Sequence, residues 1–322
     1  MDEFPLYRAL LSANPDLTNF DDRQYGFHET PALVDRVSRR LRRSALAGLF
    51  NRDIQRAISI VKPSIFIAFK ATHLSEETIN IAKAVGAKCI MIYPDLDPTI
   101  HGSGYLAALR AADHFYFTKP NLVTEFVKRV RPNAEFIFPF YSRLEVNSPL
   151  CANPSVGVSF VGHYSAGKCK DLLCFRDRLN TPMTIVGSGW GHVTTMFNSE
   201  QPTRVMEPIY GKAIRDIYRS SICSLGLLME PLSDKWAGDE ITSRSVLVPA
   251  SGGILVHPRN PSSEYLYGKD SAGLYETTNE AVRIIEQWWQ DPDKRMNDAN
   301  LQQGAVLARA TCAEDFAYNL LK

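Results

Sequence analysis

The chain has 322 residues, of which 45% are apolar, 36 are basic and 35 are acidic. This length and composition exclude a disordered or fibrous protein and predict about two domains. The formal net charge is only +1, which argues against a protein that binds nucleic acid by neutralising its phosphates. We therefore expect a folded protein without a nucleic-acid partner.

The N-terminus and the cysteines indicate a cytoplasmic protein. Met1–Asp16 carries acids where a signal peptide has a basic start and an apolar core. The longest apolar runs fall far short of the roughly 20 residues that span a bilayer. The six cysteines form no CxxC pair and no zinc-ligand spacing with the histidines, so we expect reduced thiols and no metal site.

The first half of the chain alternates short β-branched and aromatic runs with amphipathic stretches, which is typical of a parallel sheet covered by helices. Ser75 is the expected N-cap of a helix that has acids in its first turn and Gly86 at its end. The predicted strands are 65–70, 88–93, 114–119 and 135–141, and the predicted helices are 75–85, 105–112 and 122–130.

Prolines and small polar residues at 147–154 predict a linker, and a second α/β series follows it. We therefore expect two domains, 1–146 and 147–322, with a cleft between them as the site; an alternative in which the last helix crosses back stays open. In the second domain the predicted strands are 156–161, 183–186, 222–228 and 254–257, and the predicted helices are 168–179, 210–219, 278–290 and 292–322.

Three strand ends in the second half carry glycine and are candidate ligand loops. They are Phe160–Ser165, Ile185–Trp190 and Ala250–Ile254. Glycine lets the backbone approach a ligand, and the N-terminus of a following helix attracts a phosphate. For any one of them, a glycine that simply ends a strand is the alternative. The GxGxxG fingerprint and the P-loop are absent, which argues against nicotinamide cofactors and P-loop nucleotide hydrolysis.

The segment Gly238–Gly253 carries an acid, a hydroxyl and an arginine before an apolar, helix-like turn. This pattern predicts that Asp239 and Arg244 lie at the edge of the cleft. A guanidinium suits bidentate binding of a diphosphate.

Together these motifs resemble the CgeB-like glycosyltransferases, a group of the spore-maturation-protein type with the GT-B fold. The matching segments are VSFVGHYSAGK at Val158–Lys168, IVGSGW at Ile185–Trp190 and DEITSRSVLVPASGG at Asp239–Gly253. The first half matches more loosely, through Lys62–Ala71 and Ile90–Pro98. The resemblance implies two Rossmann-like parallel-sheet domains, with an acceptor on the first and a nucleotide-sugar on the second.

The resemblance implies a metal-independent, hexosyltransferase-like enzyme that uses a nucleotide-sugar as substrate and needs no further cofactor. Its acceptor would be a glycan, a lipid-linked molecule or a protein. Arg244 would neutralise the leaving diphosphate and Asp239 would hydrogen-bond the sugar, as the catalytic residues. The implied donor-binding residues are Gly162, His163, Tyr164, Gly187, Ser188, Gly189, Trp190, Thr242, Ser251 and Gly252. The acceptor-side candidates are Lys70, Asp95 and Asp97, and a turn-forming role is the alternative for the two acids.

Two departures from the family pattern keep other functions open. Leu247 stands where the family has a glutamate that resembles a ribose-binding residue. The chain also starts at a segment that resembles the helix after a first strand, so we expect the first domain to lack that strand and its glycine-rich loop. A non-catalytic sugar- or nucleotide-binding scaffold and a sugar-nucleotide epimerase of the same fold are the alternatives.

The segment Leu33–Phe50 is predicted to form a basic amphipathic helix. Its five arginines and one aspartate give a local charge of +4. Such a helix binds an anionic membrane surface, which would place the enzyme at the inner face of the membrane. An apolar stripe packed on the sheet, with the arginines in solvent, is the alternative. The stripe consists of Leu33, Val37, Leu41, Ala45 and Leu49.

Overall fold

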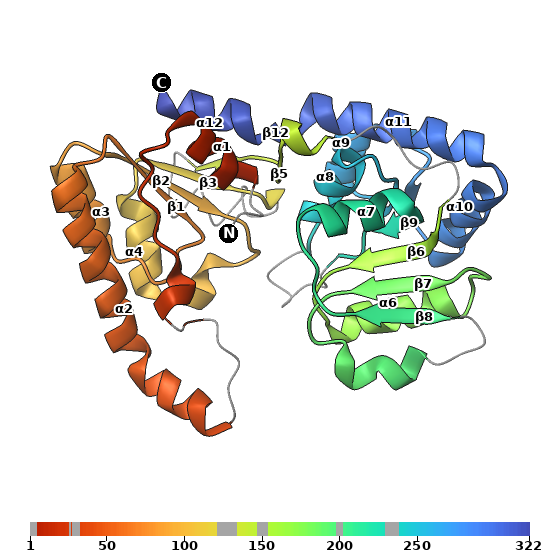
Figure 1. Ribbon diagram of the computed structural model, residues 1–322, viewed down its shortest axis with the longest axis horizontal. Helices are drawn as coiled ribbons and strands as arrows, with labels where there is room; N and C mark the ends of the chain where they lie inside the picture. The colour runs from red at the N-terminus through yellow and green to blue at the C-terminus, as the bar shows by residue number, and fades with distance from the viewer. Residues whose placement is uncertain are drawn as a thin grey trace. The chain divides into compact units, whose positions relative to one another are not determined.

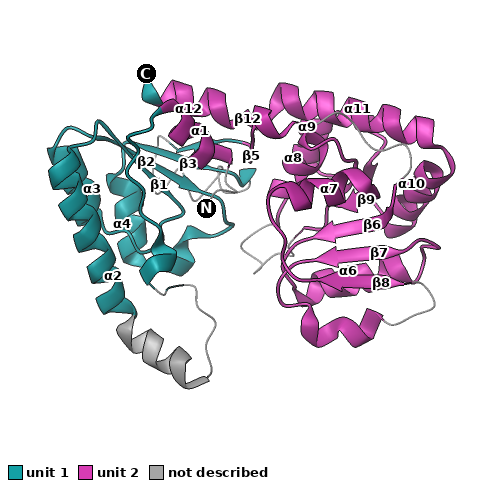
Figure 2. Cartoon of the chain, in the orientation of Figure 1, with its two compact units in different colours: residues 1, 14–137, 321 teal, residues 2–13, 138–320, 322 magenta. Residues whose placement is uncertain are grey.

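The computed structural model describes residues 5–25, 27, 33–120, 134–146, 154–197, 202–228 and 238–322, with the backbone alone for 33–42. The chain forms two compact units (Figure 2). Unit 1 is Asn14–Ile137, and unit 2 is Phe138–Leu320 together with helix α1 (Pro5–Ala13). Each unit contains a parallel sheet flanked by helices (Figure 1), so the expected α/β fold is confirmed.

Unit 1 has a four-stranded parallel sheet in the order β1-β2-β3-β4. Helices α2, α3 and α4 pack in a row, α2 on α3 and α3 on α4. Ser75 is the N-cap of α3, since its hydroxyl accepts a hydrogen bond from the backbone N–H of Thr78 at 3.2 Å. The elements are α2 (Leu33–Val61), β1 (Ile65–Phe69), α3 (Glu76–Ala84), β2 (Lys88–Tyr93), the 3-10 helix η2 (Pro98–His101), α4 (Ser103–Ala111), β3 (His114–Phe117) and β4 (Ala134–Phe136).

Most expected elements of unit 1 are present, and one expectation is wrong. The predicted strand 135–141 is divided into β4 and β5 (Phe140–Tyr141), because Pro139 lacks an N–H and β5 pairs with a different strand. The predicted helix 122–130 and residues 147–153 of the predicted linker lie outside the described residues.

Unit 2 has a six-stranded parallel sheet in the order β11-β10-β9-β6-β7-β8. The strand order reverses between β6 and β9, which are neighbours in the sheet and far apart in the chain. The core of this sheet is formed by side chains such as Phe160, Leu172, Ile185 and Trp288. The strands are β6 (Val156–Val161), β7 (Met183–Val186), β8 (Thr203–Met206), β9 (Ser221–Leu225), β10 (Leu255–Pro258) and β11 (Leu274–Tyr275).

The helices of unit 2 cover both faces of this sheet. Because strand–helix–strand crossovers are right-handed, the connection from β6 to β7 and the connection from β9 to β10 place their helices on opposite faces. Accordingly α6 packs with α10, whereas α8 packs with α11. The helices are α6 (Ala166–Arg176), α7 (Lys212–Ser220), α8 (Ser243–Ala250), α9 (Pro261–Tyr267), α10 (Thr278–Gln290), α11 (Pro292–Arg309) and α12 (Ala313–Leu321).

Two terminal segments differ from the sequence expectations. The predicted helix 292–322 is interrupted by β12 (Thr311–Cys312), which pairs in parallel with β5. The N-terminal segment, expected in the first domain, is grouped with unit 2: Arg8 of α1 forms an ion pair with Glu145 at 2.5 Å, and Arg215 of α7 binds the same carboxylate at 2.8 Å. The units divide between Ile137 and Phe138, before the expected linker, because β5 belongs with β12.

Candidate functional site

The carboxyl ends of β6 and β9 lie side by side in the unit 2 sheet. The chain continues from β6 toward β7 on one side and from β9 toward β10 on the other. Open parallel sheets bind ligands at such a point, because the diverging connections leave a crevice beyond the strands. We call this region the carboxyl edge of unit 2, and it is the candidate site.

Arg244, in the first turn of α8, bridges the two strand ends. Its Nη1 donates a hydrogen bond to the carbonyl of Val161 at the end of β6 at 2.8 Å, and its Nη2 donates to the carbonyl of Leu227 after β9. The guanidinium carbon lies 4.8 Å from the centre of the Phe160 ring, in a cation–π contact. Its Nε–H is buried and has no hydrogen-bond partner among the described residues. Arg244 is therefore a cation fixed at the switch point, and not all of its donors are used.

Gly162 makes room for this arginine, and Gly187 at the neighbouring strand end makes room for Gly162. A Cβ on Gly162 would lie 2.6 Å from Nη1 of Arg244, and a Cβ on Gly187 would lie 2.0 Å from the carbonyl oxygen of Gly162. The same carbonyl accepts a hydrogen bond from the indole N–H of Trp190 at 2.8 Å. Trp190 is only 1% exposed. Its predicted direct contact with a donor is therefore corrected to a supporting role, since its ring is packed in the core.

The loops after β6 and β7 are joined by hydrogen bonds. The backbone N–H of Tyr164 donates to the carbonyl of Ser188 at 3.0 Å, and Nδ1 of His163 lies 2.5 Å from the hydroxyl of the same serine. Gly189 has a φ of 81°, a left-handed conformation that favours glycine. The structure thus brings together the predicted residues Gly162, His163, Tyr164, Gly187, Ser188 and Gly189.

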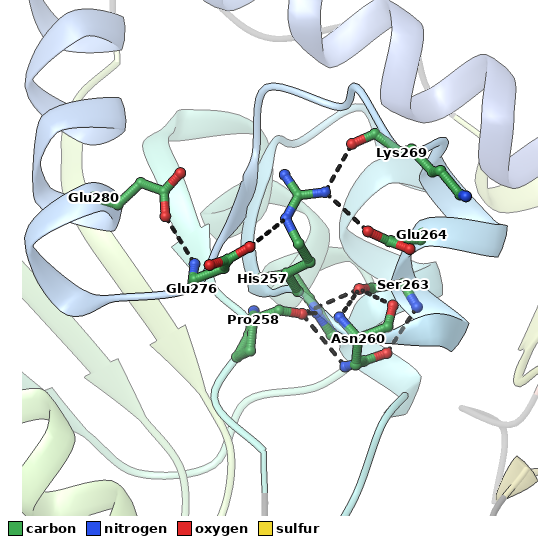
Figure 3. A network of polar contacts seen from close by, with 9 residues as sticks. His257, Pro258, Asn260, Ser263, Glu264, Lys269, Glu276 and Glu280 are labelled. Carbon is green, nitrogen blue, oxygen red and sulfur yellow. Dashed lines mark hydrogen bonds and ion pairs between the residues drawn. The ribbon is translucent and has the colours of Figure 1, made fainter.

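A buried network beneath the site fixes the N-terminus of α8. The Nδ1 of His257 donates to the carbonyl of Pro258 at 2.8 Å, so Nε2 is the unprotonated nitrogen and accepts from the hydroxyl of Ser245 at 3.0 Å. That hydroxyl accepts in turn from the backbone N–H of Thr242 at 3.1 Å. Figure 3 shows the Pro258 carbonyl, which Ser263 also binds. Burial lowers the pKa of His257 to about 4, so the imidazole is neutral at pH 7.

The other predicted residues of the DEITSRSVLVPASGG segment divide between the two edges of the sheet. Asp239 and Thr242 precede α8 at the carboxyl edge. Burial lowers the pKa of Arg244, and the negative charge of Asp239 acts in the opposite direction. Ser251 and Gly252 follow α8, at the amino end of β10. A helix of eight residues is about 12 Å long, so they lie at the opposite edge. Their assignment to the donor site is therefore wrong.

Leu247 is half-buried within α8, one turn after Arg244. Its backbone carbonyl accepts from the N–H of Ser251 at 3.0 Å. An aliphatic side chain offers no hydrogen bond to a ribose, so this position lacks the contact that the family glutamate would make.

The acceptor-side candidates lie together at the carboxyl ends of β1 and β2 in unit 1. Nζ of Lys70 forms an ion pair with Asp95 at 2.7 Å. The carboxylate of Asp97 accepts from the backbone N–H of Thr99 at 2.8 Å and from its hydroxyl at 2.6 Å, which caps η2. The turn-forming alternative therefore describes Asp97, whereas Lys70 and Asp95 are each almost half exposed.

Sequence analysis missed three residues of this group. Nε2 of His101 lies 3.0 Å from the hydroxyl of Tyr93, and the hydroxyl of Tyr105 donates to the carbonyl of Lys70 at 2.8 Å. The histidine has no metal-ligand spacing in the sequence, and the tyrosine positions are typical of core residues. Only their neighbours in the folded structure therefore identify them as part of this group. We call Lys70, Asp95, Asp97, His101, Tyr93 and Tyr105 the unit 1 cluster.

Further features bear on cofactors and membranes. A surface cavity of about 570 Å³ lies along α6, lined in part by Tyr164, Lys170, Arg178 and Met196. Across the described ranges, no group of three or more His, Cys, Asp or Glu side chains is arranged to hold a metal ion. None of the helices in that part of the chain is long and apolar enough to cross a membrane.

Comparison with known proteins supports the fold described above. A family model described as "Glycosyl transferase-like" matches residues 170–320, which contain most of unit 2. No curated protein matches the chain.

Solved structures share the fold at low sequence identity. An alpha-glucosyltransferase in complex with UDP and a 13-mer DNA is 12% identical, with a TM-score of 0.62 and 84% of each chain covered. Anabaena Alr3699/HepE in complex with UDP is 13% identical, with a TM-score of 0.59 and 86% of this chain and 81% of that chain covered. OtsA is 10% identical, with a TM-score of 0.59, and 98% of this chain and 81% of that chain are covered. The chain therefore carries a glycosyl transferase-like domain and has the GT-B fold of two Rossmann-like parallel-sheet domains.

Proposed function

We propose that the chain is a glycosyltransferase of the CgeB-like type that moves a hexose from a nucleotide-sugar to an acceptor. The donor binds at the carboxyl edge of unit 2, and the acceptor binds at the unit 1 cluster. The observation that carries this proposal is Arg244, a cation held between two strand ends at the switch point of the sheet. The UDP in the structures of the alpha-glucosyltransferase and HepE supports a nucleoside diphosphate as the donor's leaving group.

The chemistry follows from the charge of the leaving group. Cleavage of a nucleotide-sugar leaves a diphosphate, and any group that stabilises its developing negative charge accelerates the reaction. Arg244 supplies a charge-assisted donor, and the first backbone N–H groups of α6 and α8 have no partners within their helices. In this proposal these groups neutralise the diphosphate without a metal, and Asp239 hydrogen-bonds the sugar.

The test is calorimetric titration of UDP, GDP and ADP into the purified protein. We expect one nucleotide to bind and Arg244→Ala to weaken it by about 30-fold, since a charge-assisted pair contributes roughly 2 kcal/mol. Arg283→Ala is the matched control, because Arg283 is exposed on α10. Equal affinity of the wild type and Arg244→Ala would falsify the assignment.

A second variant guards against loss of folding in Arg244→Ala. Gly162→Ala keeps the arginine and displaces it, because the new methyl group would lie 2.6 Å from Nη1. We expect it to weaken nucleotide binding in the same direction while the circular dichroism spectrum is retained. Turnover of the bound nucleotide-sugar then separates the alternatives: a scaffold releases no diphosphate, and an epimerase changes the sugar without transferring it.

We also propose that Leu33–Phe50 of α2 lies on an anionic membrane surface, which places the enzyme in the cytoplasm at the inner face of the membrane. Toward its C-terminus α2 buries Phe50, Ile54 and Ile58. The two stripe residues whose side chains are described lie on a different side, since Ala45 is exposed and Leu49 is 41% exposed. Exposed apolar side chains in a segment rich in arginine are the pattern of an interfacial helix, and Ala45, Leu49 and Arg43 are exposed.

Co-sedimentation with vesicles tests this contact. We expect binding to vesicles that contain phosphatidylglycerol, weaker binding to pure phosphatidylcholine, and loss of binding in Leu49→Asp. Ile60→Asp is the matched control, because Ile60 is 72% exposed at the other end of the same helix. Binding to duplex DNA but not to vesicles would contradict the membrane contact and would favour a nucleic-acid acceptor.

A further inference from the structure

The position of His101 in the unit 1 cluster leads to an inference that rests on the proposed transferase function. We propose that His101 is the catalytic base, and that its Nδ1 accepts the proton of the acceptor hydroxyl. His101 ends η2 at the carboxyl edge of the unit 1 sheet, directly before α4. Its side chain is half-buried between the rings of Tyr93 and Tyr105, at centroid distances of 5.8 Å and 5.4 Å.

The hydrogen bonds around Tyr93 fix the tautomer of this histidine. The hydroxyl of Tyr93 donates to the backbone carbonyl of Asp97 at 2.9 Å, and a carbonyl can only accept. The hydroxyl proton is therefore used, and the Tyr93 oxygen accepts from Nε2–H of His101 at 3.0 Å. Nδ1 is then the unprotonated nitrogen, and among the described residues the hydrogen bond of this ring is the one from Nε2 to Tyr93. Its lone pair is left for a ligand.

Burial, more than the surrounding charges, keeps His101 neutral. Burial lowers the pKa of His101, and Lys70 and Arg43 act in the same direction. Asp95 and Asp97 oppose them. A neutral imidazole is the form that can accept a proton, and the two carboxylates stabilise the imidazolium that results.

The other side chains of the cluster are less suited to this step. The carboxylate of Asp95 is held by Lys70 at 2.7 Å, and the carboxylate of Asp97 accepts two hydrogen bonds from Thr99. Lys70 is a cation in its ion pair, and it has a φ of 60° that the hydroxyl of Tyr105 helps to hold through the Lys70 carbonyl. A non-glycine residue in this conformation is strained, and such strain clusters at functional sites.

The proposed step balances as a direct displacement. The acceptor oxygen forms a bond to the anomeric carbon, the bond from that carbon to the diphosphate oxygen breaks, and the electron pair leaves on the diphosphate. The hydroxyl proton passes to Nδ1 of His101. Attack opposite the leaving group inverts the anomeric configuration, so an α-linked donor gives a β-linked product.

Nitrogen NMR of protein labelled with ¹⁵N-histidine tests the tautomer without requiring transferase activity. His101→Gln identifies the resonances. We expect the Nε2–H tautomer and a midpoint below pH 6.5, and we expect Tyr93→Phe to reduce the tautomer preference. The Nδ1–H tautomer, or a midpoint at or above pH 6.5, would overturn the proposal.

Kinetics test the role in catalysis. We expect His101→Gln to lower kcat by roughly 100-fold or more with an unchanged KM for the donor, and added imidazole to restore part of the rate in His101→Ala. His114→Gln is the matched control, because His114 begins β3 at the opposite edge of the same sheet. Unchanged kcat in His101→Gln overturns the base, whereas failure to bind any nucleoside diphosphate overturns the proposed function; the two results come from separate measurements.

Discussion

The carboxyl edges of the two sheets, one in unit 1 and one in unit 2, consist of different chemical groups. In unit 2 the edge consists of glycines, backbone carbonyls and the guanidinium of Arg244, whose charge does not change near pH 7. In unit 1 it consists of ionisable residues, and tyrosine hydroxyls bind the side chain of His101 and the backbone carbonyls of Asp97 and Lys70. The difference teaches that one edge suits the binding of a fixed negative charge and the other suits the movement of a proton.

The largest expected effect comes from disrupting the close backbone packing at the unit 2 edge. Gly187→Ala would place a methyl group 2.0 Å from the carbonyl oxygen of Gly162, which is backbone and cannot rotate away. We expect a loss of about 3 kcal/mol or more in the free energy of unfolding, measured by urea denaturation, and loss of nucleotide binding. Gly191→Ala is the control, because its Cβ meets nothing within 4 Å, and should change stability by less than about 0.5 kcal/mol. Equal effects of the two variants would contradict the packing argument.

The buried His257 makes the stability of unit 2 depend on pH. Burial lowers the folded-state pKa of His257 from 6.5 to about 4. Between these values the unfolded chain binds a proton that the folded protein does not, so stability is full above pH 6.5 and falls as the pH decreases toward 4. Each pH unit removes up to about 1.4 kcal/mol, and the total loss is about 3 kcal/mol.

Urea denaturation across this pH range measures the effect as the difference between the wild type and His257→Gln. We expect the variant to be less stable at pH 7, because Ser245 loses its partner, and to lose less stability on acidification. His163→Gln is the control, since His163 is exposed. If the free energy of unfolding fell equally with decreasing pH in His257→Gln and in the wild type, His257 would not be the cause of the pH dependence.

The sequence predicted the elements that have strong local signals. The strands Lys88–Tyr93, Val156–Val161 and Met183–Val186 and the helix Thr278–Gln290 have the expected bounds. Their apolar pattern and capping residues act within the element itself. The pairing of β5 with β12 depends on residues far apart in the chain, and β11 has two residues, so neither gives a local pattern.

The same distinction applies to the candidate site. Gly162, Gly187 and Arg244 were predicted from their residue types, because glycine allows close backbone approach and a guanidinium suits a diphosphate. The structure brings the three residues together. Ser251 and Gly252 belong to the same motif as Arg244, but a helix carries them to the other edge. The partners of His101 and His257 come from other elements, so sequence spacing gave no signal for them.

Buried side-chain hydrogen bonds support the unit 1 edge, whereas close backbone packing supports the unit 2 edge. Asn51 of α2 offers the clearest test of this difference. Its side-chain amide donates to the carbonyls of Ala47 and His73, each at 2.8 Å, and its oxygen accepts from the N–H of Ser75 and the hydroxyl of Thr78. Asn51→Ala leaves these buried groups without their partner, and we expect a loss of about 2 kcal/mol by urea denaturation. Asn51→Asp retains the acceptor but places a carboxylate oxygen 2.8 Å from the two carbonyl oxygens, so it should lose at least as much stability. A loss of less than about 0.5 kcal/mol in Asn51→Ala would contradict the role of these hydrogen bonds.

The smallest expected effect concerns the strained turn after β1. Tyr105 is 2% exposed, and its hydroxyl donates to the carbonyl of Lys70, a residue with a φ of 60° that is followed by Ala71 with a φ of 30°. Tyr105→Phe retains the ring and removes this hydrogen bond, so we expect stability to fall by about 1 kcal/mol. Because Lys70 carries the ion pair to Asp95, the change should also release Asp95 and raise the midpoint of His101, as measured by NMR. Tyr116→Phe, on β3, is the control. A fall in stability without any change in the His101 midpoint would mean that the turn supports the fold alone, and that the unit 1 edge is not coupled as one group.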